Sequence, residues 1–493
     1  MPRLTIRRGE PVAEYTFEGT PTLSQALAEA GFAMAQPCGG RGTCGKCAVL
    51  SLAGEVSAPT EPEVRANARL GCQARLLGDC TVNLPMAQAW TAIQTDAASV
   101  AVLGEPMAGR YGAAVDLGTT TMVARVFDLH TGMPLGERAV VNPQTAVAAD
   151  VMGRISAALS GRLTELQTMA QAAIQAAVAG ACADAGIAGA DALVVAGNTT
   201  MLYLLTGRSP ESLACTPFQA DFRFGALEVF SGTPLYLPPC AGAFMGADLT
   251  CAALATGLCE GSETVLLADI GTNGELMLWH QGKLYAVSTA AGPAFEGGEI
   301  SQGCGGVTGA IDKVWVENGG LGVHAIGGGS ATGICGSGLL DAVAALLTLG
   351  RVDATGASDA ASFPLAGSVR LTAGDVRAVQ LAKAAIAAGM ETLLAAAGAK
   401  PADVKRLLLA GGFGSHVSVA SAVAIGLIPA ALAGKAQAVG NASLAGASAL
   451  LLDTRLREKA DWIANTAKIV PLGGDAGFEE RFIAAMGFPW GEE

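Results

Sequence analysis

The sequence predicts two folded parts: a small α+β domain at the N-terminus and a larger, duplicated α/β domain behind it. Three observations predict this division. Cysteines gather in a glycine-rich loop near the N-terminus, at residues 38–47. An apolar strand that ends in an acid and turns through Gly-Thr occurs twice, at residues 111–120 and 264–273. A further apolar strand ends in a cluster of glycines at residues 411–414.

The chain of 493 residues is apolar and acidic, with 51% hydrophobic residues, 15% charged residues and a formal net charge of −13. Such a chain is expected to fold rather than remain disordered. The negative charge disfavours nucleic acid, because the phosphates carry the same sign. The N-terminus lacks the apolar core of a signal peptide, and the uncharged runs are interrupted by proline. We therefore expect a cytoplasmic protein that binds neither a membrane nor nucleic acid.

Residues 1–85 are expected to form the small domain. Two short strands, Leu4–Ile6 and Glu14–Phe17, lie on either side of a turn. A helix follows at Leu23–Ala30, with Thr22 as its N-cap. The cysteine-rich loop comes directly after this helix, so the elements before the loop are predicted to hold it in place.

Four cysteines of this domain are the candidate metal ligands. Three have the spacing C-x5-C-x2-C and the fourth stands apart; they are Cys38, Cys44, Cys47 and Cys72. Glycines in the loop let backbone N–H groups turn toward sulfur, and four thiolates are the ligands of a [2Fe–2S] cluster. A zinc site is the alternative, although four-cysteine zinc sites usually contain two close pairs. Unconnected thiols are a third interpretation, which leaves the glycines unexplained.

The remaining cysteines are interpreted as buried thiols, because they show no C-x-x-C spacing. They are Cys80, Cys182, Cys215, Cys240, Cys251, Cys259, Cys304 and Cys335. Histidines are few and dispersed, so a histidine-based metal site is not expected.

The order strand, strand, helix, cysteine loop and final cysteine resembles the [2Fe–2S] ferredoxin fold, a β-grasp domain, through about Leu84. The five-residue gap between the first two cysteines is that of the adrenodoxin-like branch. The resemblance implies that the four cysteines hold a [2Fe–2S] cluster. Residues 86–110 are rich in alanine and lack a periodic pattern. We expect them to form a linker that lets the first domain move.

Two related hairpins mark the larger domain, residues 111–493. The first comprises Asp116, Gly118, Thr119 and Thr120, and the second comprises Asp269, Gly271, Thr272 and Asn273. Backbone N–H groups and hydroxyls in such turns donate to phosphate oxygens, whereas the acids are suited to Mg²⁺ or its waters. The repetition predicts a duplicated domain, with halves at about 111–260 and 261–493 and a ligand cleft between them.

Further glycine turns complete the nucleotide pattern. The turn with Gly411, Gly412 and Gly414 would let backbone lie against a base and ribose, and Leu193–Met201 is its counterpart in the first half. Gly336 opens a predicted helix whose N-terminus would face phosphate. No P-loop signature is present, so a P-loop NTPase is excluded. Together these motifs resemble the superfamily of acetate and sugar kinases, heat-shock cognate ATPases and actin, which implies that the domain binds ATP.

Two further acids have open roles. Asp150 and Arg154 lie four residues apart on a predicted helix, which permits a salt bridge. The superfamily resemblance also permits Asp150 to act as a catalytic acid near the attacking water. Glu296 lies in a glycine-rich loop, and its role as a catalytic acid is likewise open.

The combination of a [2Fe–2S] domain with these ATPase motifs resembles the reductive activators of corrinoid enzymes. The resemblance implies that ATP drives one electron from the cluster to Co(II), which becomes Co(I). The implied partner is a corrinoid protein or a cobalamin-dependent methyltransferase, methionine synthase among them. A reduced ferredoxin or flavoprotein would recharge the cluster, and a homodimer is compatible with the family. Fuller members carry a middle domain after the ferredoxin domain. In this sequence only the linker separates the ferredoxin domain from the ATPase domain, so we expect the middle domain to be absent.

Three other functions remain open on the sequence alone. A small-molecule kinase fused to a ferredoxin domain would need a polar substrate site, and no sugar-binding motif is apparent. An ATP-binding redox sensor or assembly factor would deliver no catalytic electron. An activator of radical dehydratases would hold a [4Fe–4S] cluster between two subunits, against which the N-terminal cysteine spacing argues.

Overall fold

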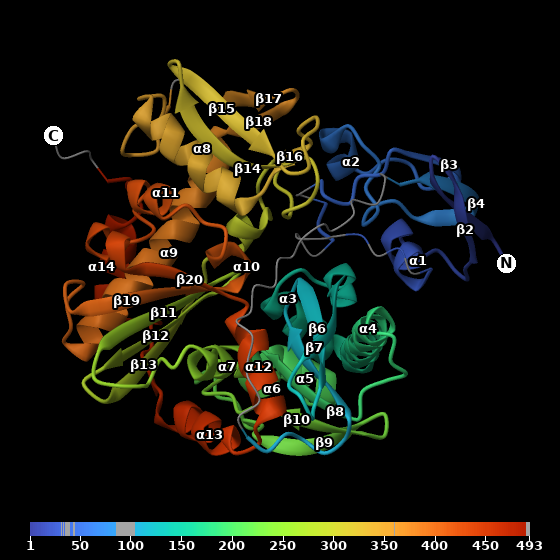
Figure 1. Ribbon diagram of the computed structural model, residues 1–493. Helices are drawn as coiled ribbons and strands as arrows, with labels where there is room; N and C mark the ends of the chain where they lie inside the picture. Colours follow the sequence, from blue (N-terminus) through green and yellow to red (C-terminus); the bar gives the residue numbers. More distant parts are fainter. Residues whose placement is uncertain are drawn as a thin grey trace.

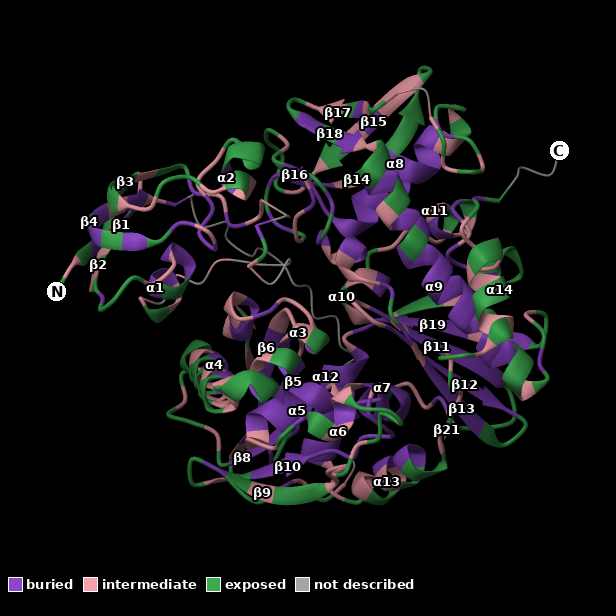
Figure 2. Ribbon diagram, turned by 180° about the vertical axis from the view of Figure 1, so that it is seen from behind, coloured by how far each residue is buried: buried purple, intermediate pink, exposed green. Residues whose placement is uncertain are grey.

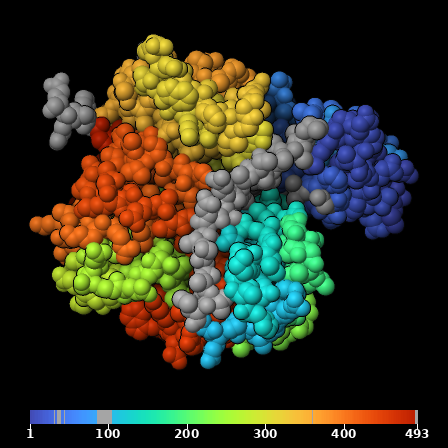
Figure 3. Space-filling view, in the orientation of Figure 1, coloured from blue at the N-terminus to red at the C-terminus, as the bar shows by residue number. Residues whose placement is uncertain are grey.

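The computed structural model describes residues 1–30, 32, 34, 40–42, 45–84, 104–358 and 360–489. Figure 1 shows a small N-terminal domain beside a larger domain of two lobes. The space-filling view in Figure 3 shows this N-terminal domain as a separate lobe, in dark blue. Most of the predicted linker lies outside the described residues.

The N-terminal domain is a four-stranded sheet in the order β2-β1-β4-β3 with two short helices. Its elements are β1 (Arg3–Arg8), β2 (Glu10–Thr16), α1 (Leu23–Glu29), β3 (Ser51–Val56), α2 (Glu61–Ala66) and β4 (Leu76–Asn83). β1 runs antiparallel to β2 and parallel to β4. The predicted N-cap of the helix is confirmed, because Thr22 accepts a hydrogen bond from the backbone of Gln25 and the reciprocal bond completes a capping box.

Two six-stranded sheets form the larger domain, and their shared topology confirms the duplication. Their orders are β7-β6-β5-β8-β10-β9 and β20-β19-β11-β12-β13-β21. In each, three antiparallel strands (β5 to β7, and β11 to β13) are followed by a strand parallel to the first of them, β8 or β19. The two predicted hairpins are therefore equivalent turns, β5–β6 and β11–β12.

The elements of the first half are as follows. They are β5 (Tyr111–Leu117), β6 (Thr121–Asp128), β7 (Pro134–Val141), η1 (Pro143–Ala146), α3 (Val151–Ala157), η2 (Ala158–Arg162), α4 (Leu163–Asp184), β8 (Ala192–Gly197), α5 (Thr199–Thr206), α6 (Glu211–Ala214), β9 (Ala226–Phe230), β10 (Thr233–Leu237) and α7 (Ala247–Ala255).

The second half contains two small additional sheets, β15-β14-β16 and β17-β18. Its elements are β11 (Thr264–Ile270), β12 (Gly274–His280), β13 (Lys283–Thr289), η3 (Pro293–Glu296), β14 (Ala310–Glu317), β15 (Gly320–Ala325), β16 (Gly333–Ile334), α8 (Gly336–Thr348), β17 (Ser362–Ala366), β18 (Val369–Thr372), α9 (Ala373–Ala397), β19 (Val404–Ala410), α10 (Gly411–Gly414), α11 (Val419–Ala424), η4 (Ala430–Lys435), β20 (Ala436–Gly440), α12 (Ala442–Leu452), α13 (Leu456–Thr466), β21 (Lys468–Ile469) and α14 (Ala476–Ala484).

One hydrophobic core lies between the two large sheets, where α7 packs against α12, and a larger one lies within the second half around α8 and α9. α12 follows the last large strand of the second half, yet it also contacts β5 and β8 of the first half. The halves are therefore interlocked, because a helix from near the C-terminus completes the core of the first sheet. Figure 2 shows these central elements largely buried, while exposed residues lie on the outer helices and loops.

Helix α9 is long and apolar; its most apolar 18-residue window has a mean hydropathy of 1.3, and 78% of that window is buried inside the protein. It packs on β12 and β13. The helix is therefore a buried element of the second half. Within the described ranges, no second helix has the length and hydropathy to cross a membrane.

Candidate functional site

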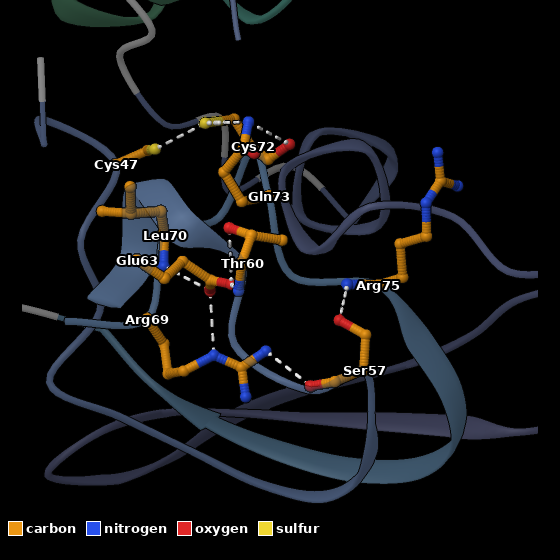
Figure 4. A network of polar contacts seen from close by, with 9 residues as sticks. All are labelled: Cys47, Ser57, Thr60, Glu63, Arg69, Leu70, Cys72, Gln73 and Arg75. Carbon is orange, nitrogen blue, oxygen red and sulfur yellow. Dashed lines mark hydrogen bonds and ion pairs between the residues drawn. The ribbon is translucent and has the colours of Figure 1, made fainter. Parts of the chain in front are cut away.

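Two of the predicted cluster ligands face each other in the N-terminal domain. Cys47 donates a hydrogen bond to Cys72 over 3.3 Å between the sulfur atoms, as Figure 4 shows. This bond lowers the pKa of the Cys72 thiol to about 6, against the opposing effect of burial. A thiolate is the form that binds iron. Cys38 and Cys44 lie outside the described residues, so the pair of thiols is the part of the predicted site that can be placed.

A buried carboxylate supports the turn that presents Cys72. Glu63 accepts hydrogen bonds from Arg69 Nε at 2.8 Å and from the backbone N–H of Leu70 at 3.0 Å (Figure 4). Burial alone would raise the pKa of Glu63, but these donors and the backbone of Thr60 lower it. The loop glycines behave as expected, since Gly45 has a φ of +67°. The described residues thus fit a loop built to hold a thiolate-bound cluster.

A cavity of about 460 Å³ lies between the two halves of the larger domain. Most of the predicted nucleotide residues line it, namely Asp116, Gly118, Thr119, Thr120, Asp269, Gly271, Thr272, Asn273, Gly336, Gly411 and Gly412. Gly414 is not among the lining residues and packs against Leu409 beneath the turn. Backbone and hydroxyl donors from both hairpins therefore surround one space, as a polyphosphate requires.

The carboxylate of Asp116 is held by the N-terminus of α12. It accepts hydrogen bonds from Asn441 Nδ2 and Ser443 Oγ, both at 2.8 Å. Asn198, at the end of β8, donates to the hydroxyl of Thr119 at 3.0 Å. The first hairpin is thus fixed by residues from two distant parts of the chain. Burial raises the pKa of Asp116, and the two donors oppose that shift.

Three more acids, Asp248, Glu275 and Asp312, line the same cavity and were missed by sequence reasoning. Burial raises the pKa of Asp248 and of Asp269 to about 7, and nearby carboxylates, Asp116 among them, add to both shifts. The pKa of Glu275 is raised well above its usual value for the same reasons. A cavity lined by several carboxylates and few positively charged side chains suits a divalent metal ion. Glu275 could have been found, because it stands at the start of the strand that leaves the second hairpin.

Glu296 joins the two hairpins across the cavity. Its Oε2 accepts a hydrogen bond from Thr120 Oγ1 and its Oε1 accepts one from Thr272 Oγ1, both at 2.9 Å. The rings of Phe295 and Phe413, which also line the cavity, stack with centroids 4.9 Å apart. The cavity therefore has a polar part at the hairpins and an aromatic part suited to a base.

Asp150 and Arg154 do not act as the ion pair that their spacing permitted. Asp150 caps α3, accepting a hydrogen bond from the backbone of Gly153 at 2.8 Å, and it is not among the residues lining the cavity. Arg154 is fully buried and donates instead to Thr119 O at 2.5 Å and to Gln144 Oε1 at 3.1 Å. Arg154 therefore supports the first hairpin, while the catalytic role of Asp150 stays a prediction.

We expect Arg154→Met to lower the free energy of unfolding of the larger domain by about 2–4 kcal/mol, because Thr119 O on the first hairpin and the buried Gln144 Oε1 lose their donor. Nucleotide affinity should fall as well, since Thr119 is no longer held. Thermal unfolding followed by circular dichroism checks the first effect. A loss below about 1 kcal/mol would show that Arg154 does not support the hairpin.

The thiol predictions need correction at three positions, because Cys215 is exposed and Cys259 and Cys304 are only half-buried. Cys240 and Cys251 are buried as expected, but Cys215 is exposed because it follows the short helix α6 at the surface. Cys304 and Cys335 line the cavity, although they were expected to be ordinary core thiols.

The fold and the site define an ATPase of the actin-like class that carries a ferredoxin domain for a [2Fe–2S] cluster. The corrinoid activation enzyme RamQ of Eubacterium limosum is 32% identical over 418 residues, covering 76% of this chain and 69% of that protein. The chain therefore belongs to the family of reductive activators of corrinoid proteins.

Two other relatives agree with this assignment. The reductase of the Co(II) methylated amine-specific corrinoid protein of Methanosarcina barkeri is 26% identical over 402 residues, covering 73% of this chain and 72% of that protein. A solved structure of a reductive activator for a corrinoid iron–sulfur protein aligns with a TM-score of 0.71 and 25% identity, covering 99% of this chain and 98% of that one.

Three family models match the chain in sequence. Residues 9–77 match the 2Fe-2S iron-sulfur cluster binding domain, residues 111–261 match the RACo middle region, and residues 263–493 match the C-terminal ASKHA domain of RACo. The second match corrects the expectation that the middle domain is missing. The middle region is present and coincides with the first half of the duplicated domain, which carries the first phosphate hairpin.

Proposed function

We propose that this protein uses ATP to drive one electron from a [2Fe–2S] cluster on Cys38, Cys44, Cys47 and Cys72 to the Co(II) of a corrinoid partner. The cluster supplies the one-electron chemistry when it is bound. The observation that supports the coupling is a contact between the two domains. Lys46, beside Cys47 in the cluster loop, donates to the backbone oxygen of Gly303 at 2.5 Å, and Gly303 lies in the segment that leads into the nucleotide cavity.

Different residues of the cleft bind the phosphates, the Mg²⁺ ion and the nucleoside. The hydroxyls and backbone of Thr119, Thr120 and Thr272 bind phosphate, and Asp116 and Asp269, with Asp248 and Glu275, bind Mg²⁺. Gly411 and Gly412 lie against the nucleoside. An uphill electron transfer needs a tenfold change in equilibrium for about every 59 mV. Binding ATP supplies such factors by favouring one arrangement of the domains over another.

The partner is a corrinoid protein or a cobalamin-dependent methyltransferase, with methionine synthase as the first to test. A reduced ferredoxin or flavoprotein in the cytoplasm recharges the cluster. A homodimer is compatible with the proposal, which requires only one cluster and one nucleotide cleft for each electron.

The test is to mix reduced holoprotein with a Co(II) corrinoid protein and to follow the cobalt absorption with and without Mg-ATP. We expect Co(II) to convert to Co(I) only when ATP is present. Absence of any ATP-dependent loss of the Co(II) signal, across several native corrinoid proteins, would contradict the proposal. Transfer of phosphate from ATP to a small molecule would favour a ferredoxin-fused kinase instead.

A further inference from the structure

The carboxylate of Glu296 accepts hydrogen bonds from the hydroxyl groups that a nucleotide phosphate would need as donors. Thr120 and Thr272, one from each half, both donate to it. A threonine hydroxyl has one proton to donate, so it cannot serve Glu296 and a phosphate oxygen at once. A carboxylate beside a terminal phosphate is also repelled by the like charge. Phosphate binding at the two hairpins must therefore act on Glu296.

The segment that carries Glu296, residues 293–306, is here called the relay loop, and it is closely packed on itself. Gly297, at a φ of +78°, lies so near Cys304 that an added Cβ would be 2.6 Å from its backbone nitrogen and oxygen. A Cβ added at Gly303 would be 2.4 Å from the oxygen of Gly297. Because closely packed segments transmit displacement rather than absorb it, a shift at Glu296 is expected to move Gly303.

The relay loop is also where the N-terminal domain contacts the second half. Gly303 O accepts the hydrogen bond from Lys46, which precedes the predicted ligand Cys47. On the other half, α1 lies against η1. The N-terminal domain therefore contacts both halves of the nucleotide cleft. Figures 1 and 2 show it beside both, with α2 near β16 and α1 near α3.

We propose that the relay loop couples nucleotide binding to the position of the cluster domain. When phosphate binds, the hydroxyls of Thr120 and Thr272 donate to it instead of to Glu296. The relay loop then shifts, and the hydrogen bond between Lys46 and Gly303 breaks. Only hydrogen bonds are exchanged in this step. The inference rests on the proposed function, because it describes how ATP releases the cluster domain toward a corrinoid partner. Glu296 and Lys46 act as positioning residues.

Thermodynamic linkage makes the relay measurable without any electron transfer. Lys46→Met removes a contact that nucleotide binding must otherwise break. Holoprotein with this change should bind Mg²⁺ with a non-hydrolysable ATP analogue roughly 3–10-fold more tightly than wild type. In a Glu296→Gln background, where the carboxylate bridge is lost, the same change should alter affinity less than about twofold. Arg65→Met, at an exposed position on α2 of the same domain, is the matched control and should leave affinity unchanged.

A second measurement does not depend on altering a residue beside a cluster ligand. Hydrogen exchange of the backbone amides at residues 45–50 should speed up when the analogue binds to wild-type holoprotein, and should not change in Glu296→Gln. Three results would each overturn the relay. Lys46→Met could leave the affinity for the analogue unchanged, or it could change that affinity equally in the wild-type and Glu296→Gln backgrounds. Hydrogen exchange at residues 45–50 of wild type could also stay unchanged when the analogue binds. A protein that shows the coupling but never reduces Co(II) would overturn the proposed function and leave the relay standing.

Discussion

Cys72→Ser is expected to assemble no normal [2Fe–2S] cluster and to reduce Co(II) corrinoid protein no faster than the reaction without protein. Cys72 is one of two thiols that approach to 3.3 Å in the described part of the loop, and a serine oxygen is a poor substitute for a thiolate at iron. Binding of Mg-ATP should be retained, because the nucleotide cavity lies in the other domain. Iron content and visible circular dichroism measure the cluster, the cobalt absorption measures Co(II) reduction, and calorimetric titration measures binding of Mg-ATP.

Cys80→Ala is the matched control for this prediction. Cys80 is a buried thiol on β4 of the same domain, where burial raises its pKa to about 11, so it behaves as an apolar core residue. The variant should keep its cluster and its electron transfer. If Cys80→Ala lost the cluster while Cys72→Ser kept it, the assignment of the fourth ligand would be wrong. If Cys72→Ser lost nucleotide binding, the division into two domains would be wrong.

Asp269→Asn is expected to slow ATP-dependent Co(II) reduction by at least about 100-fold, with the visible spectrum of the cluster unchanged. The carboxylate lines the cavity at the second hairpin, where a negative charge is needed for Mg²⁺. Burial and the charges of Asp116 and Glu296 raise its pKa to about 7, so a neutral asparagine should not harm the fold. Thermal stability equal to wild type or higher would separate lost chemistry from lost structure.

Asp403→Asn is the control for the loss of an aspartate in the same half. Its carboxylate accepts a local backbone hydrogen bond from Lys400, and it is not among the residues that line the cavity. Activity should stay within about twofold of wild type. Full activity of Asp269→Asn at saturating Mg-ATP would contradict the role given to the second hairpin.

The hairpins could be predicted because their chemistry is local. Asp116 and Asp269 each end an apolar strand and precede Gly-Thr, and the structure brings both to one cavity. The partners of these acids could not be predicted, because tertiary folding supplies them. Asn441 and Ser443 lie at the start of α12, far along the chain from Asp116. No periodic pattern relates such distant residues.

The role of Arg154 shows a second limit of sequence reasoning. A spacing of four residues predicts a pair on an exposed helix face. Here the arginine is buried against the first hairpin and binds a backbone oxygen, while Asp150 caps its own helix. The error about the middle domain has a similar cause. Its absence was inferred from the short linker, but the region itself begins at the first hairpin strand and forms half of the cleft.

The central claim is that one chain passes an electron to cobalt and that ATP makes the transfer possible. The most direct test is a single turnover with reduced holoprotein, freed of external reductant, and a Co(II) corrinoid protein. Electron paramagnetic resonance follows the reduced cluster while absorbance follows Co(I). We expect Mg-ATP to cause the loss of one cluster spin for each Co(I) formed. Co(I) formed equally without ATP, or an ATP-dependent loss of the cluster signal with no Co(I), would contradict the claim.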